Sequence, residues 1–308
     1  MSSPVSQPEA AAFVSAEIGS QPDVWLQAAE LAASSAAVLP QRGERIAVVG
    51  CGTSAFIAQA YASYREAAGH GETDAFVASE YPMVPQPRAY DRVVAITRSG
   101  TTTEVLDLFE ALPASQRTLA IVGDPASPGA TAANDAVLMP FADEKSVVQT
   151  RFATSVLSLL RAGLGHDISA LAEQARSALA APLPDGWDSF VQFVFLGRGA
   201  GVGLATEAGL KMREAAIAWA ESYPAMDYRH GPISLAEKHS LVWFLTEPPI
   251  GLPEQIRATG ASVETTTLDP QAELVRIQRT AIAIALHRGY NPDQPRNLTR
   301  SIVLEGEH

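Results

Sequence analysis

Two short apolar runs, each followed at once by a hydroxyl-rich turn, most constrain what this chain can fold into. The run 46–49 leads into Gly50-Cys51-Gly52-Thr53-Ser54, and the run 93–96 leads into Thr97-Arg98-Ser99-Gly100-Thr101-Thr102. Each turn then continues into a helix-like segment. Free backbone N–H groups and the positive end of a helix dipole attract anions at such a turn, and Ser and Thr hydroxyls add donors. The pair of turns therefore predicts a site for one phosphorylated small molecule.

Strand-like and helix-like segments alternate along the first half of the chain. The β-like runs are 46–49, 74–78, 93–96, 118–122 and 136–139, and helices are expected at 54–68 and 103–111. This alternation predicts an α/β fold with a mostly parallel sheet flanked by helices. Residues 1–40 predict an N-terminal helical segment that is broken at Gln21-Pro22. Residues 41–180 predict a first, phosphate-binding domain, which ends in a helix-like stretch from Val147 to about Leu179 with a break near 163–165.

The same pattern starts again after residues 181–186, which have the composition of a linker. An apolar run at 190–196 is followed by a glycine-rich turn and by a helix-like segment at 204–223. Strands are expected at 241–245 and 262–267, and a last helix at about 271–287. Residues 187–308 therefore predict a second α/β domain, similar to the first in architecture and only weakly in sequence.

Charge and composition exclude several classes of partner. Lys+Arg number 22 and Asp+Glu 34, and the resulting net charge of −12 disfavours nucleic acid and anionic membranes. No apolar stretch approaches the roughly 18 residues that span a bilayer. The single cysteine excludes an intrachain disulfide and a cysteine-based metal site. Because no Lys or Arg precedes Arg42, the start lacks the basic region of a secretory signal. We expect a cytoplasmic protein that binds no metal, no nucleic acid and no membrane.

Arg98, Cys51 and a glycine cluster each allow two interpretations. The Arg98 guanidinium suits a phosphate group, and this role is favoured over that of a solvated surface charge. Cys51 could be a nucleophile activated by a helix N-terminus, although a small residue packed beneath the phosphate turn is favoured. The alternate glycines from Gly197 to Gly203 have the spacing G-x-G-x-G-x-G rather than the G-x-G-x-x-G of a dinucleotide site. We therefore expect no nicotinamide or flavin cofactor.

Glu207, Lys211 and Glu214 have the spacing i, i+4 and i+7 and would share one face of a helix. One interpretation is an ion-pair ladder on the surface; the apolar residues around them favour partial burial and a functional role instead. His230 precedes Gly231-Pro232 and is expected in a fixed, non-helical position, where it could be a structural hydrogen-bonding group. Glu214 and His230 would together serve as an acid–base pair that moves protons between carbon and oxygen.

Seven segments, in the same order along the chain, resemble the sugar isomerase (SIS) double-domain family. The resemblance is to the isomerase half of glucosamine-6-phosphate synthase and to stand-alone aminosugar-phosphate deaminases and isomerases. The segments are 17–22, the turns at 50–54 and 99–102, 144–151, 207–214, 230–232 and 293–298. This resemblance covers nearly the whole chain and implies two SIS-type subdomains, each a mostly parallel sheet flanked by helices.

The resemblance also implies a role for each candidate residue. The turns would hold a sugar 6-phosphate, and the residues implied there are Gly52, Ser54, Thr97, Arg98, Ser99 and Thr102. Thr53 would approach the reacting end of the sugar, and Val147 would lie in a segment that covers the substrate. Glu214 would carry a proton between C1 and C2, and Lys211 would position Glu214. His230 would open the sugar ring and would come from the partner subunit of a homodimer with a shared active site.

The chain departs from the synthases of this family in three places. It starts at Met1-Ser2, with no glutaminase domain and with Ser2 in place of a processing-exposed Cys, so we expect that it cannot draw ammonia from glutamine unaided. Arg300 stands where the synthases carry a Lys, and an Arg cannot form an imine with a ketose. Arg98 stands where the synthases usually carry a Gln, which adds charge to the second turn.

These observations lead us to expect a phosphosugar aldose–ketose isomerase of the aminosugar-deaminating type, which uses no cofactor. It would convert glucosamine 6-phosphate to fructose 6-phosphate and ammonia. A simple ketose/aldose phosphate isomerase and a fructosamine-phosphate deglycase remain alternatives. A non-catalytic phosphosugar sensor is a third alternative, but such sensors usually carry a DNA-binding helix-turn-helix, and residues 1–40 contain no Lys or Arg. The presence of both Glu214 and His230 also favours an enzyme.

Overall fold

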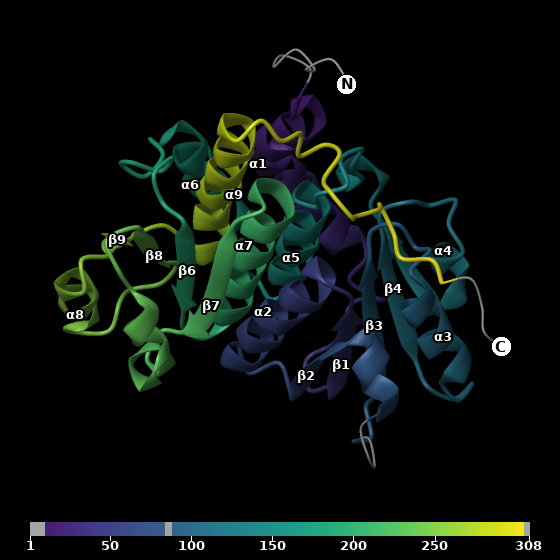
Figure 1. The fold of residues 1–308 in the computed structure, drawn as a ribbon. Helices are drawn as coiled ribbons and strands as arrows, with labels where there is room; N and C mark the ends of the chain where they lie inside the picture. Colours follow the sequence, from purple (N-terminus) through teal and green to yellow (C-terminus); the bar gives the residue numbers. More distant parts are fainter. Residues whose placement is uncertain (1–9, 84–87, 305–308) are drawn as a thin grey trace. The chain divides into compact units, whose positions relative to one another are not determined.

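The computed structural model describes residues 10–83 and 88–304, which form two compact units (Figure 1). Each unit is assembled from separate stretches of sequence. Unit 1 comprises residues 10–22, 145–150 and 170–298, and unit 2 comprises residues 23–83, 88–144, 151–169 and 299–304. The predicted α/β class is confirmed, because each unit contains a parallel sheet with helices packed against it. The predicted domain boundaries stay predictions, and residues 1–9 of the predicted N-terminal helical segment lie outside the described residues.

Unit 2 contains a parallel sheet of five strands in the order β2-β1-β3-β4-β5. The strands are β1 (Ile46–Gly50), β2 (Thr73–Val77), β3 (Arg92–Thr97), β4 (Thr118–Val122) and β5 (Asp135–Leu138). The helices of this unit are α2 (Thr53–Ala67), α3 (Thr103–Ala111), α4 (Gly129–Ala132) and α5 (Arg151–Gly163), with short 3₁₀ turns at Ala78–Met83 and Pro140–Ala142. All five β-like runs of the first half are therefore strands, as predicted.

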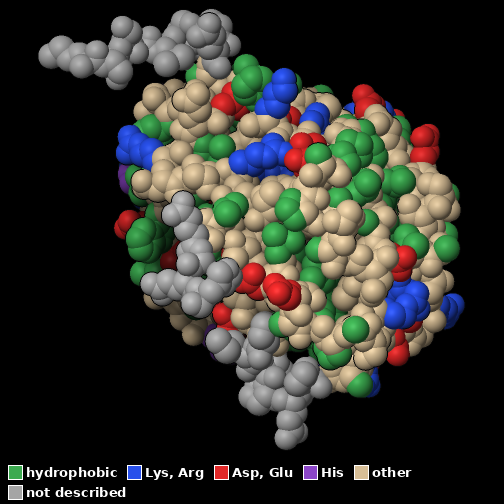
Figure 2. Space-filling view, turned by 90° about the vertical axis from the view of Figure 1, so that its right-hand side faces the viewer, with side chains coloured by type: hydrophobic (Ala, Val, Ile, Leu, Met, Phe, Trp, Pro, Cys, Tyr) green, Lys and Arg blue, Asp and Glu red, His purple; other side chains and the backbone are tan. Residues whose placement is uncertain are grey.

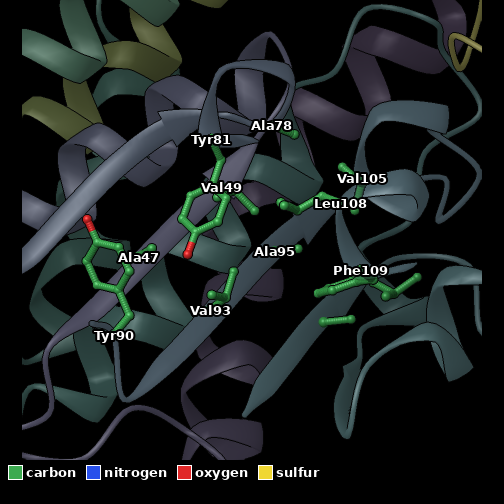
Figure 3. Packing of buried hydrophobic residues seen from close by; sticks show 12 residues of the cluster. Ala47, Val49, Ala78, Tyr81, Tyr90, Val93, Ala95, Val105, Leu108 and Phe109 are labelled. Atoms are coloured by element: carbon green, nitrogen blue, oxygen red, sulfur yellow. The ribbon is translucent and has the colours of Figure 1, made fainter. Parts of the chain in front are cut away.

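The core of unit 2 fixes where its turns lie. Every residue of β1, β3 and β4 is buried, as expected for central strands of a parallel sheet that is covered on both faces. Figure 3 shows part of this core, in which Val49 and Ala95 from two neighbouring strands lie with Tyr81 and Leu108. Val49 pairs with Ala95 in register, so the ends of β1 and β3 lie within one residue of each other along the sheet. Chain order reverses between these two strands, and ligands of open α/β sheets bind at such a point.

Unit 1 contains a second parallel sheet, with four strands in the order β7-β6-β8-β9. The strands are β6 (Gln192–Gly197), β7 (Trp219–Pro224), β8 (Ser240–Phe244) and β9 (Ser262–Glu264). The helices are α6 (Ile168–Ala180), α7 (Ala200–Ala216), α8 (Leu252–Ala258) and α9 (Pro270–His287), with 3₁₀ turns at Asp227–His230 and Pro232–Leu235. α7 packs on β6, β7 and α9. Chain order again reverses between the two central strands, β6 and β8.

The predicted helix 204–223 is wrong over its second part. α7 ends at Ala216, and Ile217 adopts the left-handed conformation with φ 50°. The Ala218 N–H then donates to the Met212 carbonyl (3.2 Å), which closes the end of the helix. Residues 219–224 become β7, the edge strand of the sheet, because they pair along the whole length of β6. A β-branched residue at a left-handed helix end is uncommon, so no Gly or Pro marks this boundary in the sequence.

The predicted break at Gln21-Pro22 is also wrong, since α1 (Ala12–Ser34) runs through Pro22. A proline in a helix leaves the carbonyl four residues earlier without its N–H donor. Here the Gln21 side-chain amide donates to that carbonyl, on Ile18, at 3.2 Å. The same amide nitrogen lies 2.8 Å from Oε1 of Gln278 on α9. The predicted break near 163–165 is confirmed, but residues 147–150 precede α5 and are not helical.

Candidate functional site

The first hydroxyl-rich turn joins β1 to α2 in unit 2. Gly52 has φ 53° and ψ −125°, a conformation that residues with a side chain rarely adopt, and α2 begins at the next residue. Thr53 and Ser54 are each 4% exposed. A Cβ on Gly50 would lie 2.6 Å from the Ser54 Cβ, so the start of α2 lies directly on the end of the strand. The turn therefore holds two predicted binding residues at a fixed place beside the end of β1.

Cys51 is a packing residue in this turn, as the favoured interpretation predicted. Burial, and then the negative charge of Glu104, raises the pKa of the Cys51 thiol to about 11. The thiol therefore stays protonated near neutral pH, whereas a nucleophilic cysteine reacts as the thiolate. Cys51 also packs against the hydrophobic core of unit 2.

The second turn, between β3 and α3, uses its own hydroxyls to satisfy its backbone. The Gly100 N–H donates to Thr97 Oγ1 and the Thr101 N–H donates to Ser99 Oγ, each at 3.2 Å. Gly100 has φ 62°, and a Cβ there would collide with the Ser127 hydroxyl. Thr97 and Ser99 are 3% and 7% exposed. Because their oxygens accept from the backbone, each hydroxyl keeps its proton for donation elsewhere.

Arg98 is buried at 5% exposure, so the interpretation as a solvated surface charge is wrong. Its Nη1 lies 3.9 Å from a carboxylate oxygen of Glu144. Glu144 also accepts the backbone N–H groups of Arg151 (2.8 Å) and Phe152 (3.1 Å), the first residues of α5. The charge of Arg98 is thus opposed by a carboxylate that caps α5. Its role as a phosphate ligand stays a prediction.

Residues 299–304, which we call the strap, lie across the second turn within unit 2. The Ser301 hydroxyl lies 3.1 Å from Ser99 Oγ and 3.0 Å from Thr101 Oγ1. The Thr103 N–H donates to the Ile302 carbonyl (3.2 Å). The sequence suggested no role for Ser301, because its partners lie about 200 positions earlier in the chain. Thr102 precedes α3 and is partly buried beside these contacts.

Unit 1 brings together the three predicted charged residues of α7. The side chains of Glu207 and Lys211 are each 1% exposed, and Lys211 Nζ lies 3.4 Å from a Glu207 oxygen. Lys211 also donates to Glu214, whose side chain is 20% exposed. A ladder of surface ion pairs is therefore excluded. The arrangement is a buried ammonium group between two carboxylates, one of which reaches solvent.

His230 and Val147, the remaining predicted residues, also lie in unit 1. His230 is exposed at the end of a 3₁₀ turn and precedes Gly231, whose φ is 140°. Val147 is partly buried in the non-helical segment 145–150. Glu17 of α1 fixes the start of that segment, because its carboxylate accepts the N–H groups of Lys145 (2.6 Å) and Ser146 (3.2 Å) and the Ser146 hydroxyl. The motif around Glu17 was visible in the sequence, but these contacts were not.

Charge is dispersed over the face seen in Figure 2, where Lys and Arg side chains lie singly or in small groups among acidic ones. No helix in the described part of the chain is both long and apolar enough to cross a membrane. Within residues 10–83 and 88–304, no three His, Cys, Asp or Glu side chains gather as ligands for a metal ion.

Known proteins match the chain in sequence over much of its length. It is 28% identical to the glutamine–fructose-6-phosphate aminotransferase [isomerizing] of Thermus thermophilus, over 86% of this chain and 53% of that protein. The corresponding enzyme of Pyrobaculum aerophilum is also 28% identical, over 92% of this chain and 57% of its own length. The chain thus spans about half the length of the curated relatives it matches. No established family profile matches it.

Solved structures share the fold of the whole chain. Tagatose-6-phosphate ketose/aldose isomerase from Escherichia coli superposes with a TM-score of 0.80 at 19% identity, over 99% of both chains. The C-terminal domain of glucosamine-fructose-6-phosphate aminotransferase from Francisella tularensis gives 0.79 at 20% identity, over 94% of this chain and 100% of that domain. Glucosamine-6-phosphate deaminase from Thermotoga maritima superposes with a TM-score of 0.77 at 24% identity, over 94% of this chain and 100% of that protein. The similarity in sequence and the shared fold agree with the resemblance to the sugar isomerase (SIS) double-domain family that the motifs indicated.

Proposed function

We propose that this protein is a phosphosugar aldose–ketose isomerase of the aminosugar-deaminating type. Its substrate would be glucosamine 6-phosphate, and its products would be fructose 6-phosphate and ammonia. The observation that carries the proposal is the charged cluster on α7, where Lys211 lies between Glu207 and Glu214 and only Glu214 reaches solvent. A carboxylate held in one orientation and open on one side is suited to abstract and return a proton at carbon.

Glu214 is the proton-transfer group in this proposal. It removes the C2 proton of the open-chain aminoaldose, the electron pair forms the C1=C2 bond of an enolamine, and O1 gains a proton. The proton held by Glu214 is returned at C1 while the amino nitrogen loses one proton, which leaves a ketimine at C2. Water then adds to C2 and ammonia leaves, so the ketose 6-phosphate is formed. Lys211 positions Glu214 through its direct hydrogen bond and is itself held near Glu207.

The turns of unit 2 bind the 6-phosphate in this proposal, and the residues involved are Gly52, Ser54, Thr97, Arg98, Ser99 and Thr102. Oriented hydroxyl donors on rigid strand ends support this assignment, because they can hold an anion at a fixed position. Thr53 would approach the sugar carbons, and Val147 would contact the substrate. His230 would open the ring. Its exposure in the single chain is compatible with a homodimer in which the partner supplies it.

The direct test is to incubate the purified protein with glucosamine 6-phosphate and to measure ammonia and ketose separately. Equal amounts of both products support the deaminating reaction. Interconversion of hexose 6-phosphates without ammonia would identify a plain isomerase, the kind of enzyme that the tagatose-6-phosphate ketose/aldose isomerase of the same fold is. Ammonia-independent cleavage of a fructosamine phosphate would identify a deglycase. Binding of phosphosugars without turnover across this panel would refute the catalytic proposal and favour a sensor.

A further inference from the structure

The hydroxyls of Ser99, Thr101 and Ser301 form a closed ring in unit 2. The oxygen–oxygen distances are 3.1 Å between Ser99 and Ser301, 3.0 Å between Thr101 and Ser301, and 3.0 Å between Thr101 and Ser99. A hydroxyl has one proton to donate. The three hydroxyl protons are therefore all used in the three contacts within the ring, in whichever direction around the ring they point. No hydroxyl of the ring can donate to a further acceptor unless one of these contacts breaks.

The strap also accepts hydrogen bonds from two other donors, one at the start of α3 and one in the second turn. The Thr103 N–H, in the first turn of α3, donates to the Ile302 carbonyl at 3.2 Å. The Arg98 Nη2 donates to the Arg300 carbonyl at 2.9 Å. Each of these groups is of the kind that an anion would use at such a turn. The strap therefore presents three oxygen acceptors, from Arg300, Ser301 and Ile302, to donors of the predicted phosphate turn.

We propose that the strap is an internal competitor of the phosphate group. In the structure described here, Ser301 occupies the donors of the second turn, and a phosphate that accepts from Ser99 must first displace it. This inference rests on the proposed phosphate site. It adds that the chain binds phosphate with an affinity reduced by its own strap, so that release of the strap and occupancy of the turn are coupled.

Arg300 anchors the strap through contacts that are partly exposed to solvent, which suits a segment that can be released. Arg300 binds the Asp143 carboxylate through two contacts of 2.6 and 2.7 Å, and it also donates to the Glu144 carbonyl. The side chains of Arg300 and Asp143 are 38% and 30% exposed, so water and salt screen this pair. The residues after Ser301 are exposed, and Leu304 is tied to Thr103 by one hydrogen bond from its N–H (2.9 Å). Such a strap can be displaced without loss of core contacts.

Titration with inorganic phosphate at constant ionic strength tests the competition. Ser301→Ala removes the third hydroxyl of the ring, and Asp143→Asn weakens the anchor without changing the turn. Both variants should bind phosphate about three- to tenfold more tightly than the unaltered chain, the range expected for loss of one competing hydrogen bond. Ser115→Ala, at an exposed serine in the same unit, is the matched control and should not alter the affinity.

Amide hydrogen exchange gives a second readout on the unaltered chain. Saturating phosphate should speed exchange of the Leu304 N–H, because the strap leaves the turn. Weaker phosphate binding by Ser301→Ala would overturn the inference, since Ser301 would then be a ligand rather than a competitor. If the unaltered chain binds phosphate and both variants bind it equally, competition is also refuted while the phosphate site stands. If none of the proteins binds phosphate, the proposed phosphate site fails and the inference fails with it.

Discussion

Gly52 and Gly199 adopt nearly the same backbone conformation, with φ 53° and ψ −125° at Gly52 and φ 54° and ψ −128° at Gly199. Each directly precedes the helix that follows a central strand, α2 after β1 and α7 after β6. The two sheets also share their strand order up to the fourth strand. The two units therefore share a turn conformation as well as a strand order, and a glycine stands in both turns where this backbone conformation requires one.

Replacing Gly52 with Ala should destabilise the protein. A residue with a Cβ is strained at a positive φ with this ψ, and the expected loss in the free energy of unfolding is about 1–3 kcal/mol. Urea denaturation measures it. Gly19→Ala is the control, because Gly19 is exposed in α1 and an added Cβ would meet nothing within 4 Å. That variant should gain about 0.5–1 kcal/mol. Equal stability of Gly52→Ala and the unaltered chain would contradict the strain argument.

Gln21 and Pro22 should show energetic coupling. Gln21→Ala removes the donor that replaces the missing N–H at the Ile18 carbonyl. Pro22→Ala restores a backbone N–H at position 22, so the cost of Gln21→Ala should be smaller in that background by about 1 kcal/mol. A double-mutant cycle of unfolding free energies gives this value. Additive effects would show that the side-chain bond to Ile18 does not compensate for the proline.

Glu214→Gln should separate chemistry from binding. The amide keeps the size of the side chain but cannot accept the C2 proton, so turnover of glucosamine 6-phosphate should fall by about 10²–10⁴-fold. The dissociation constant of fructose 6-phosphate should change little, because the proposed phosphate ligands are untouched. Glu237→Gln, at an exposed glutamate of unit 1, should leave both quantities unaltered. A parallel loss of binding and turnover would indicate that Glu214 has a structural role.

Cys51 should react slowly with alkylating reagents in the folded protein. Its thiol pKa is raised to about 11 from an ordinary value of 9.0, mainly by burial. At pH 8 the thiolate fraction is then about a hundredfold lower than in the unfolded chain, and the alkylation rate should fall at least as much. Below pH 9 the Cys51 thiol is mostly protonated in both the folded and the unfolded protein. The alkylation rate of the folded protein should increase as the pH rises toward 11. Rapid modification of the folded protein at pH 8 would refute the packing role.

Local sequence patterns were sufficient to predict the five strands of unit 2 and the turns that follow β1 and β3. Apolar runs such as 46–49 and 93–96 are buried on both faces, so their composition alone indicates central parallel strands. β7 was missed because it is an edge strand with a mixed pattern, and only its pairing with β6 distinguishes it from a continuation of α7. Pro22 was misinterpreted because a side chain supplies what its backbone lacks.

The candidate site was predictable where its residues are neighbours in the chain. The spacing of Glu207, Lys211 and Glu214 places them together on one helix, and the structure confirms that they are together. The contact between Glu17 and Ser146 joins residues 129 positions apart, and that between Ser99 and Ser301 joins residues 202 positions apart. Such contacts produce no periodic pattern in a single sequence, because they depend on how distant segments pack.

The strap has a consequence for the growing chain on the ribosome. The second turn is synthesised 202 residues before Ser301. At about 5–20 residues per second, roughly 10–40 s pass before the strap can reach it. During that interval the hydroxyls of Ser99 and Thr101 lack their third partner, so the phosphate site proposed above would be open to a ligand. On that proposal, a phosphate ester bound at that stage would stabilise the partly synthesised unit, and the strap could compete with it only after Ser301 has been made.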